Sequence, residues 1–258
     1  MAVITTLQRV PRPVVAAILG GWAFVVAAEL WGAGHALHHD TLIESGLPRW
    51  AALALFLAAW QAMIAAMMLP SSLPLIALFS RAAANQPHPR RAFAAFIGGY
   101  AAVWSLFGAV AFIGDIGVHQ AADAWLWLRE RPWLISGSTL LLAGAFQFSS
   151  LKDRCLRECR RPEAFLVGRY ARGLPAAFRT GWEHGLFCLG CCWALMLLMF
   201  ATGVANLAWM GALTLVMVIE KTARAGERAV RVIGVVLLLL GALALAQPPE
   251  FASLCAAR

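Results

Sequence analysis

Charged residues are scarce in this sequence, and lysine is almost absent. Only 13% of its 258 residues are charged and 61% are hydrophobic, whereas about 25% of an average soluble domain is charged. Of 21 basic residues only Lys152 and Lys221 are lysines, and the other 19 are arginines. Together with a mean hydropathy of +0.73, this composition excludes an ordinary soluble domain and indicates a polytopic integral membrane protein.

Several sequence signatures are also missing. There is no Walker phosphate-binding loop, no dinucleotide-binding glycine pattern and no nucleophile elbow. Neither an internal repeat nor a low-complexity segment nor a second soluble domain can be recognised. The net charge of +8 comes from arginines in short loops between apolar segments, which is typical of membrane topology and does not indicate nucleic-acid binding. Whether the protein is an enzyme is left undecided.

The apolar residues gather into segments of the length that a spanning helix needs, about 17 to 25 residues. Pro70 and Pro74 are expected to end or kink the second segment. The sequence therefore predicts an all-α fold, with residues 1–258 forming a single integral membrane domain: a bundle of about seven transmembrane helices. The predicted spans are 14–34, 50–69, 92–114, 133–149, 181–203, 206–220 and 229–247.

Basic residues alternate between the predicted loops. They concentrate before residue 13 and in the segments 80–91, 150–180 and 221–231, and they are sparse in 35–49, 115–132, 203–206 and after 247. Because arginine and lysine accumulate on the cytoplasmic side, the N-terminus is predicted to be cytoplasmic and the C-terminus exported. The lipid bilayer is thus a predicted partner, and a nucleic acid is not.

Three cysteines lie within the fifth predicted span, and two more lie in the loop before it. Helical spacing of three and four residues places side chains on one face, and Cys188 would lie about 10 Å along this span at 1.5 Å per residue. Cytosol-facing thiols are normally reduced, so metal ligation or catalysis is favoured over a structural disulfide. A donor set this rich in sulfur favours copper over zinc or iron as the bound transition metal. The predicted metal ligands are Cys155, Cys159, Cys188, Cys191, Cys192, His184, Met196 and Met199.

A second group of candidate ligands lies on the opposite, exported side. Three histidines end the first predicted span with helical spacing, and an ionisable residue inside a span is a functional hypothesis by default. Imidazole and carboxylate donors suit Cu(II), zinc or iron. This predicted second metal site comprises Glu29, His35, His38, His39, Asp115 and His119.

Three motifs, AMMLPSSLP, LKDRCLRECRRP and GLFCLGCCWALMLLMFATGVANLAWM, carry a family resemblance. The sequence resembles the bacterial DUF2182 family of predicted metal-binding integral membrane proteins, from about residue 60 to residue 221. This resemblance implies a multi-span protein of the bacterial inner membrane that binds metal through its cysteines. The positions to which it points are Met67, Met68, Pro70, Ser71, Pro74, Lys152, Cys155, Cys159, Cys188, Gly190, Cys191, Cys192, Trp193, Asn206, Trp209, Met210, Glu220 and Lys221.

Three functions remain open at this point. The first is a copper-binding membrane protein that handles or delivers the metal through the cytoplasmic-side cysteines, with a metal donor or acceptor protein as partner. The second is a membrane thiol or metal-dependent oxidoreductase in which the cysteines form a relay. The third is an assembly subunit of a larger membrane complex, in which the sulfur atoms only fill space.

Overall fold

A computed structural model describes residues 10–31, 48–125, 127, 131–202 and 206–246 of the chain. Its elements in this part of the chain are all helices, which confirms the predicted all-α fold. They are α2 (Arg12–Leu30), α4 (Arg49–Ala83), α5 (Pro89–Ala124), α7 (Pro132–Phe146), α8 (Ser150–Arg160), α9 (Pro162–Arg169), α10 (Leu174–Thr202), α11 (Leu207–Thr222) and α12 (Gly226–Ala246).

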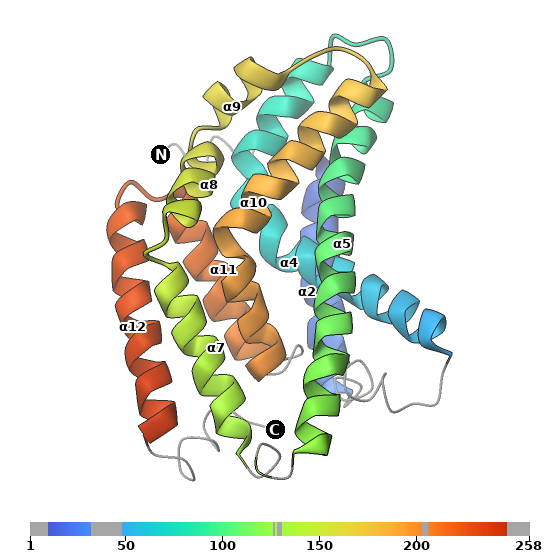
Figure 1. Ribbon diagram of the computed structural model, residues 1–258. Coiled ribbons are helices and arrows are strands. Elements are labelled where there is room, and N and C mark those ends of the chain that lie inside the picture. Colours follow the sequence, from blue (N-terminus) through green and yellow to red (C-terminus); the bar gives the residue numbers. More distant parts are fainter. Residues whose placement is uncertain (1–9, 32–47, 126, 128–130, 203–205, 247–258) are drawn as a thin grey trace.

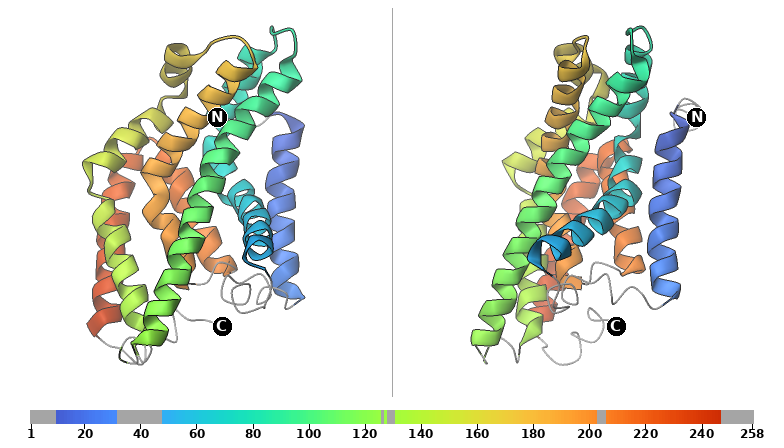
Figure 2. Two further views of the ribbon diagram at one scale, coloured as in Figure 1. Left: turned by 45° about the vertical axis from the view of Figure 1, so that its right-hand side comes forward. Right: turned by 90° about the vertical axis from the view of Figure 1, so that its right-hand side faces the viewer.

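The long helices run back and forth between two ends of one elongated bundle (Figures 1 and 2). The short helices α8 and α9 lie at one end, together with the starts of α5, α10 and α12. Because Arg90, Arg91, Arg172 and the arginines of α8 gather there, we call it the arginine-rich end. Helix α2 begins at this end, and α12 ends at the opposite end (Figure 1).

Among the described residues, five helices are long and apolar enough to cross a membrane: α2, α4, α5, α10 and α12. The pair formed by α7 and α8 qualifies as a sixth span if it is counted as one helix bent by 65°. At 16 residues, α11 is about 24 Å long, shorter than the roughly 30 Å hydrocarbon core. The predicted number of about seven spans is therefore not confirmed.

Helix α4 runs through both of its prolines and does not end at them. Proline has no N–H to donate, so Pro70 leaves the carbonyl of Ala66 without its helical partner. The indole of Trp22 on α2 donates a hydrogen bond of 3.1 Å to this carbonyl. A neighbouring helix thus satisfies the group that the proline frees, and the first half of α4 runs obliquely while its second half follows the bundle axis (Figure 1).

Glycines allow the helices to approach one another closely, as is common in membrane bundles. A side chain at Gly181 would collide with the backbone of Phe96, and one at Gly99 with the backbone of Phe178, so α5 and α10 pack along their backbones. Gly144 and Gly241 have the same role between α7 and α12. The close pairing of α5 with α10 fixes the helix that carries three of the cysteines.

The chain breaks between α7 and α8 at residues 147–149. The hydroxyl of Ser149 accepts a hydrogen bond of 3.1 Å from the backbone N–H of Lys152 and so caps a new helix. Helix α8 is strongly amphipathic, with Lys152, Cys155 and Leu156 buried and Arg154 and Arg157 exposed. The break turns this buried face of α8 toward α10 and α11.

Candidate metal site

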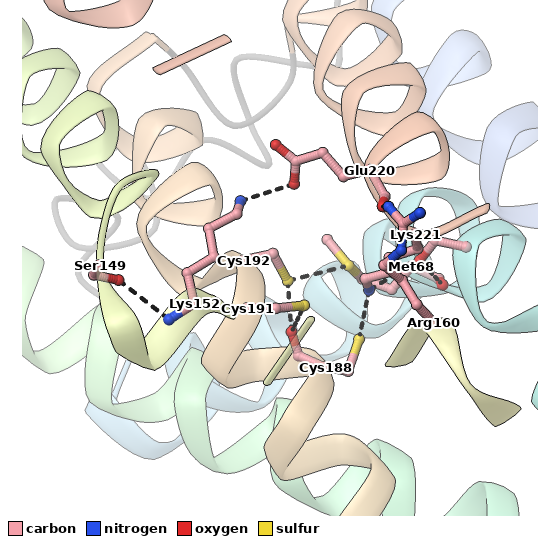
Figure 3. Close-up of polar contacts among 10 residues, drawn as sticks. Met68, Ser149, Lys152, Arg160, Cys188, Cys191, Cys192, Glu220 and Lys221 are labelled. Carbon is pink, nitrogen blue, oxygen red and sulfur yellow. Dashed lines mark hydrogen bonds and ion pairs between the residues drawn. The ribbon is translucent and has the colours of Figure 1, made fainter. Parts of the chain in front are cut away.

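The three cysteines of α10 lie in the interior of the bundle. Cys188, Cys191 and Cys192 are each at most 1% exposed. Helix α10 begins seven residues before the predicted span, so Cys188 lies about 21 Å from the first residue of the helix. The predicted distance from the start of the shorter span was about 10 Å. The thiols of Cys191 and Cys192 donate to the carbonyl oxygen of Cys188, at 3.0 Å and 2.8 Å (Figure 3). Three sulfur atoms are therefore gathered on little more than one helical turn.

A lysine from α11 reaches this cluster. The ammonium of Lys221, which is 6% exposed, lies 3.1 Å from Cys188 Sγ and donates a hydrogen bond of 3.1 Å to Ser71 Oγ on α4 (Figure 3). A buried charge is costly unless it is paired. Cys188 Sγ lies within hydrogen-bond distance of the ammonium, and a thiolate there would compensate the positive charge.

Helix α4 contributes a thioether to the same cluster. Cys192 Sγ and Met68 Sδ lie 3.9 Å apart (Figure 3), and Met68 is completely buried. Metal–sulfur bonds of about 2.3 Å are long enough for one ion to bridge two sulfur atoms at this separation. The donor set thus fits a soft ion such as Cu(I).

The two cysteines of α8 lie next to the cysteines of α10. A side chain at Gly190 would lie 2.5 Å from Cys155 Sγ, so the Cys155 side chain packs directly against the backbone of α10. The Cys159 and Cys191 thiols interact across the same interface. Cys155 is buried, whereas Cys159 is only partly buried. All five described cysteines are free thiols.

A chain of hydrogen bonds leads from Cys188 to His184. Tyr100 OH lies 3.2 Å from Cys188 Sγ and 3.4 Å from Ser72 Oγ, and Ser72 Oγ lies 3.2 Å from His184 Nε2. The His184 ring stacks on the Tyr100 ring, with centroids 5.4 Å apart. The ring of His184, a predicted ligand, is therefore linked to Cys188 Sγ through two hydroxyl groups.

Next to the sulfur cluster, a buried ion pair joins α8 to α11. Lys152 Nζ lies 2.7 Å from Glu220 Oε2, with both side chains at most 2% exposed. Arg160 donates to the backbone carbonyls of Glu220 and Ala223, at 2.8 Å and 2.9 Å, which caps the last turn of α11. These contacts hold the cysteine face of α8 against the end of α11 that carries Lys221.

Two other predicted ligands lie further along α10. Met196 and Met199 are completely buried, about 6 Å and 10.5 Å beyond Cys192 by helical rise, toward the end opposite the arginine-rich one. They continue the line of sulfur-bearing side chains along the helix. Whether they bind metal stays a prediction.

The second predicted site falls largely outside the described residues. His35, His38 and His39 lie in the segment 32–47, which the structure does not describe. Glu29 is exposed near the end of α2, while Asp115 and His119 lie on α5. This site also stays a prediction.

Sequence reasoning missed Tyr100 and Ser72 as neighbours of the cysteines. Tyr100 is one of only two tyrosines and lies inside an apolar span, where a hydroxyl needs a partner. That signal could have singled it out. Its pairing with Cys188 could not have been read from the sequence, because the two residues are 88 positions apart.

In the part of the chain that the structure describes, no three or more His, Cys, Asp and Glu side chains are placed together as a preformed metal-binding group. The thiols of Cys191 and Cys192 point instead at the carbonyl of their own helix. Rotation about the χ1 angle of either cysteine would free its sulfur for a metal. The geometry therefore fits a site that forms when the ion arrives.

A family model described as PpoB2, copper chaperone, matches residues 57–244. The match covers well over half of the chain: most of α4, all of α5 to α11 with the five cysteines of the cluster, and α12 up to residue 244. It does not include α2. No curated protein and no solved structure matches the chain.

Proposed function

The chain belongs to the PpoB2 copper chaperone family, and we propose that it carries Cu(I) as cargo, held between sulfur atoms of α10 and α4 inside a membrane. The observation that carries this proposal is the approach of Cys192 Sγ to Met68 Sδ at 3.9 Å in a completely buried setting. Thiolate and thioether together select Cu(I) over harder ions.

Charge balance supports the same assignment. One thiolate bound to Cu(I) forms a pair with no net charge. A second thiolate gives the cluster one net negative charge. Lys221 supplies one buried positive charge at 3.1 Å from Cys188 Sγ. The cluster can therefore hold Cu(I) with Cys188 and Cys192 as thiolates without leaving an unpaired charge in the membrane interior.

The α8 cysteines give the ion a path toward the cluster. Cys159 is the most exposed of the five described thiols and interacts with Cys191. We infer that a donor protein passes Cu(I) to Cys159 and Cys155, and that the ion moves by ligand exchange to Cys191 and Cys192. Copper stays Cu(I) throughout: each incoming thiol releases one proton as its sulfur–copper bond forms, and each outgoing thiolate takes one up.

The proposed location is the bacterial inner membrane, with the arginine-rich end in the cytoplasm. The positive charge of that end supports this orientation. Donor proteins would then dock from the cytoplasm, where the α8 thiols are kept reduced.

Copper content of the purified, detergent-solubilised protein tests the proposal. After anaerobic loading with Cu(I) and desalting, we expect about one bound ion per chain in the wild type and loss of most of it in Cys192→Ser. Met68→Leu keeps the apolar volume but removes the thioether, so it should lower retention of Cu(I) against a competing chelator by about tenfold or more.

Two variants serve as matched controls. Cys255→Ser removes a cysteine outside the family match, and Met217→Leu removes a thioether that is equally buried on α11. Both should bind copper like the wild type. Wild-type protein that is metal-free after loading, or equal losses in Met68→Leu and Met217→Leu, would contradict the proposal.

A thiol-relay oxidoreductase is the second candidate, and burial argues against it. A relay requires an accessible thiolate, whereas Cys188, Cys191 and Cys192 are at most 1% exposed. Of the five described cysteines, Cys159 is the one that is partly exposed. Native alkylation that labels two or more of the α10 cysteines in copper-free protein would favour the relay over the chaperone.

A further inference from the structure

In the described part of the chain, methionine is confined to the interior of the bundle. All eight methionines except Met1 lie in this part, and each of them is at most 3% exposed. Leucine, which has a similar volume, is divided between the interior and the surface, where Leu106, Leu215 and Leu239 are exposed. Methionines that served only as apolar filler would be distributed like leucine. Besides Met68, the buried methionines are Met63, Met67, Met196, Met199, Met210 and Met217.

The register of α10 and α11 brings two of these methionines, Met199 and Met210, to the same level. The two helices are antiparallel (Figure 1), and Lys221 Nζ lies 3.1 Å from Cys188 Sγ. Met199 follows Cys188 by 11 residues, and Met210 precedes Lys221 by 11 residues. At 1.5 Å per residue, both methionines lie about 16.5 Å from that contact, toward the end opposite the arginine-rich one.

The short connection between the two helices also keeps this pair close together. Met199 lies three residues before the end of α10 at Thr202, and Met210 lies three residues after the start of α11 at Leu207. Helices with so short a connection pack as antiparallel neighbours, and α10 and α11 do contact one another. Packed helix axes lie about 8–10 Å apart, a gap that two methionine side chains can fill from opposite sides.

Met196 connects the pair with the cysteine cluster. It follows Cys192 by four residues and precedes Met199 by three, so the three side chains share one face of α10. The steps along the helix are about 6 Å and 4.5 Å, which lie within the reach of flexible methionine side chains. Cu(I) can therefore pass from one sulfur atom to the next without entering the hydrocarbon of the bilayer.

The thioether pair differs from the cysteine cluster in charge. Thioethers bind soft Cu(I) but are neutral, so an ion held by Met199 and Met210 keeps its positive charge, which is costly inside a membrane. The pair is expected to hold Cu(I) more weakly than the thiolates do, and this favours release of the ion. Copper stays Cu(I) in the transfer: its bond to Cys192 Sγ breaks, a bond to a thioether forms, and the thiolate takes up one proton.

We propose that Met199 and Met210 form a second, weaker Cu(I) site in the half of the bundle opposite the arginine-rich end, and that the ion reaches it from Cys192 by way of Met196. The chain then moves copper across the membrane toward an acceptor on the far side. This inference rests on the proposed function, since it states where the cargo goes after the cysteine cluster.

Copper binding at equilibrium tests the second site. With excess Cu(I) and no oxygen, the detergent-solubilised wild type should bind about two ions per chain, of which desalting removes the weaker one. Met199→Leu and Met210→Leu keep the apolar volume and should lose the second ion but retain the first. Met217→Leu is the matched control, because it removes an equally buried thioether about 10.5 Å from Met210 along α11. It should bind both ions.

Copper transfer is measured with the full chain in phosphatidylcholine vesicles that enclose a membrane-impermeant, chromogenic Cu(I) chelator. Cu(I) is supplied outside as its glutathione complex. The trapped chelator should take up copper at least about tenfold faster in wild-type vesicles than in protein-free vesicles. Met199→Leu and Met210→Leu should lower this rate about tenfold or more, whereas Met217→Leu should leave it unchanged.

Two results would overturn the proposal. One is that Met199→Leu and Met210→Leu bind the second ion and transfer copper as Met217→Leu does. The other is that wild-type vesicles take up copper no faster than protein-free ones. In either case the first ion would still be held by Cys192 and Met68, and the proposed function would stand. Wild-type protein that holds no copper at all would instead contradict the proposed function itself.

Discussion

At the scale of single residues, Lys221 decides how much negative charge the sulfur cluster can hold. Its ammonium contacts Cys188 Sγ and Ser71 Oγ and is nearly inaccessible to water. In Lys221→Met the charge and both hydrogen bonds are lost while most of the side-chain volume remains. Because hydrogen bonds to charged groups contribute about 1.5–3 kcal/mol, we expect Cu(I) affinity to fall about ten- to a hundredfold, measured by chelator competition.

The variant Lys221→Arg tests whether the charge alone of residue 221 is enough for Cu(I) binding, or whether its shape also matters. It keeps the positive charge but carries a larger, planar head, so it should recover only part of the affinity. The Tm of the metal-free variants reports whether the fold is intact. Wild-type Cu(I) affinity in Lys221→Met would mean that the ammonium has no part in holding the metal.

The residues of the site differ in how far the sequence revealed them. The cysteines of α10 and α8 share helical faces through spacing of three and four residues, so their grouping follows from local geometry. Lys221, Met68 and Tyr100 approach the cluster from three other helices. One sequence carries no information about which helices pair, and therefore these contacts appear only in the structure.

At the scale of elements, the Lys152–Glu220 ion pair determines where α8 lies. Glu220→Leu would leave the Lys152 ammonium buried and unpaired, which costs about 3–5 kcal/mol. Replacing both residues, in Lys152→Met with Glu220→Leu, removes the charges together and should restore most of the lost stability. The free energy of unfolding in mixed micelles measures each variant.

The ion pair at Arg169 and Glu183 serves as a comparison, because both of its side chains are about a quarter exposed. Glu183→Gln should change the unfolding free energy by no more than about 1 kcal/mol. If Glu220→Leu is as mild as Glu183→Gln, the buried pair does not anchor α8.

The packing of α5 on α10 can be tested with two adjacent glycines. A side chain at Gly99 would meet the backbone of Phe178 and lie 2.8 Å from the backbone nitrogen of Trp182, whereas one at Gly98 has no atom within 4 Å. Gly99→Ala should therefore push α10 away and cost about 1–3 kcal/mol, while Gly98→Ala is neutral or slightly stabilising. Equal unfolding free energies for the two variants would contradict this helix contact.

Helix boundaries show where sequence reasoning falls short at this scale. The existence of each apolar helix was predictable from hydropathy, but α4 continues past Pro70 because Trp22 satisfies the freed Ala66 carbonyl. Likewise α10 begins at Leu174, not near residue 181, and its added turns pack on α5, where the backbone of Phe178 lies against Gly99. Both differences arise from contacts between helices.

At the scale of the whole molecule, the crossing of α11 decides whether the chain traverses the membrane six or seven times. The helix is about 24 Å long, but it runs parallel to the bundle between the end of α10 and the start of α12 (Figure 1). A short span is tolerated when the bilayer thins or flanking residues snorkel. Asn206 caps its first turn, with Oδ1 3.1 Å from the N–H of Trp209, which satisfies one polar group at that boundary.

We therefore expect seven crossings, with the arginine-rich end in the cytoplasm. Alkaline phosphatase, which is active only after export, should be inactive when fused after residue 87 or residue 224 and active when fused after residue 246. The phosphatase activities of the fusions after 224 and 246 should differ because α12 crosses the membrane between them. A fusion after residue 204 should be active, because α11 crosses the membrane between residues 204 and 224. If the fusions after 204 and 224 gave the same activity, α11 would not cross the membrane, and Lys221 would have to reach Cys188 from a helix that enters and leaves on one side.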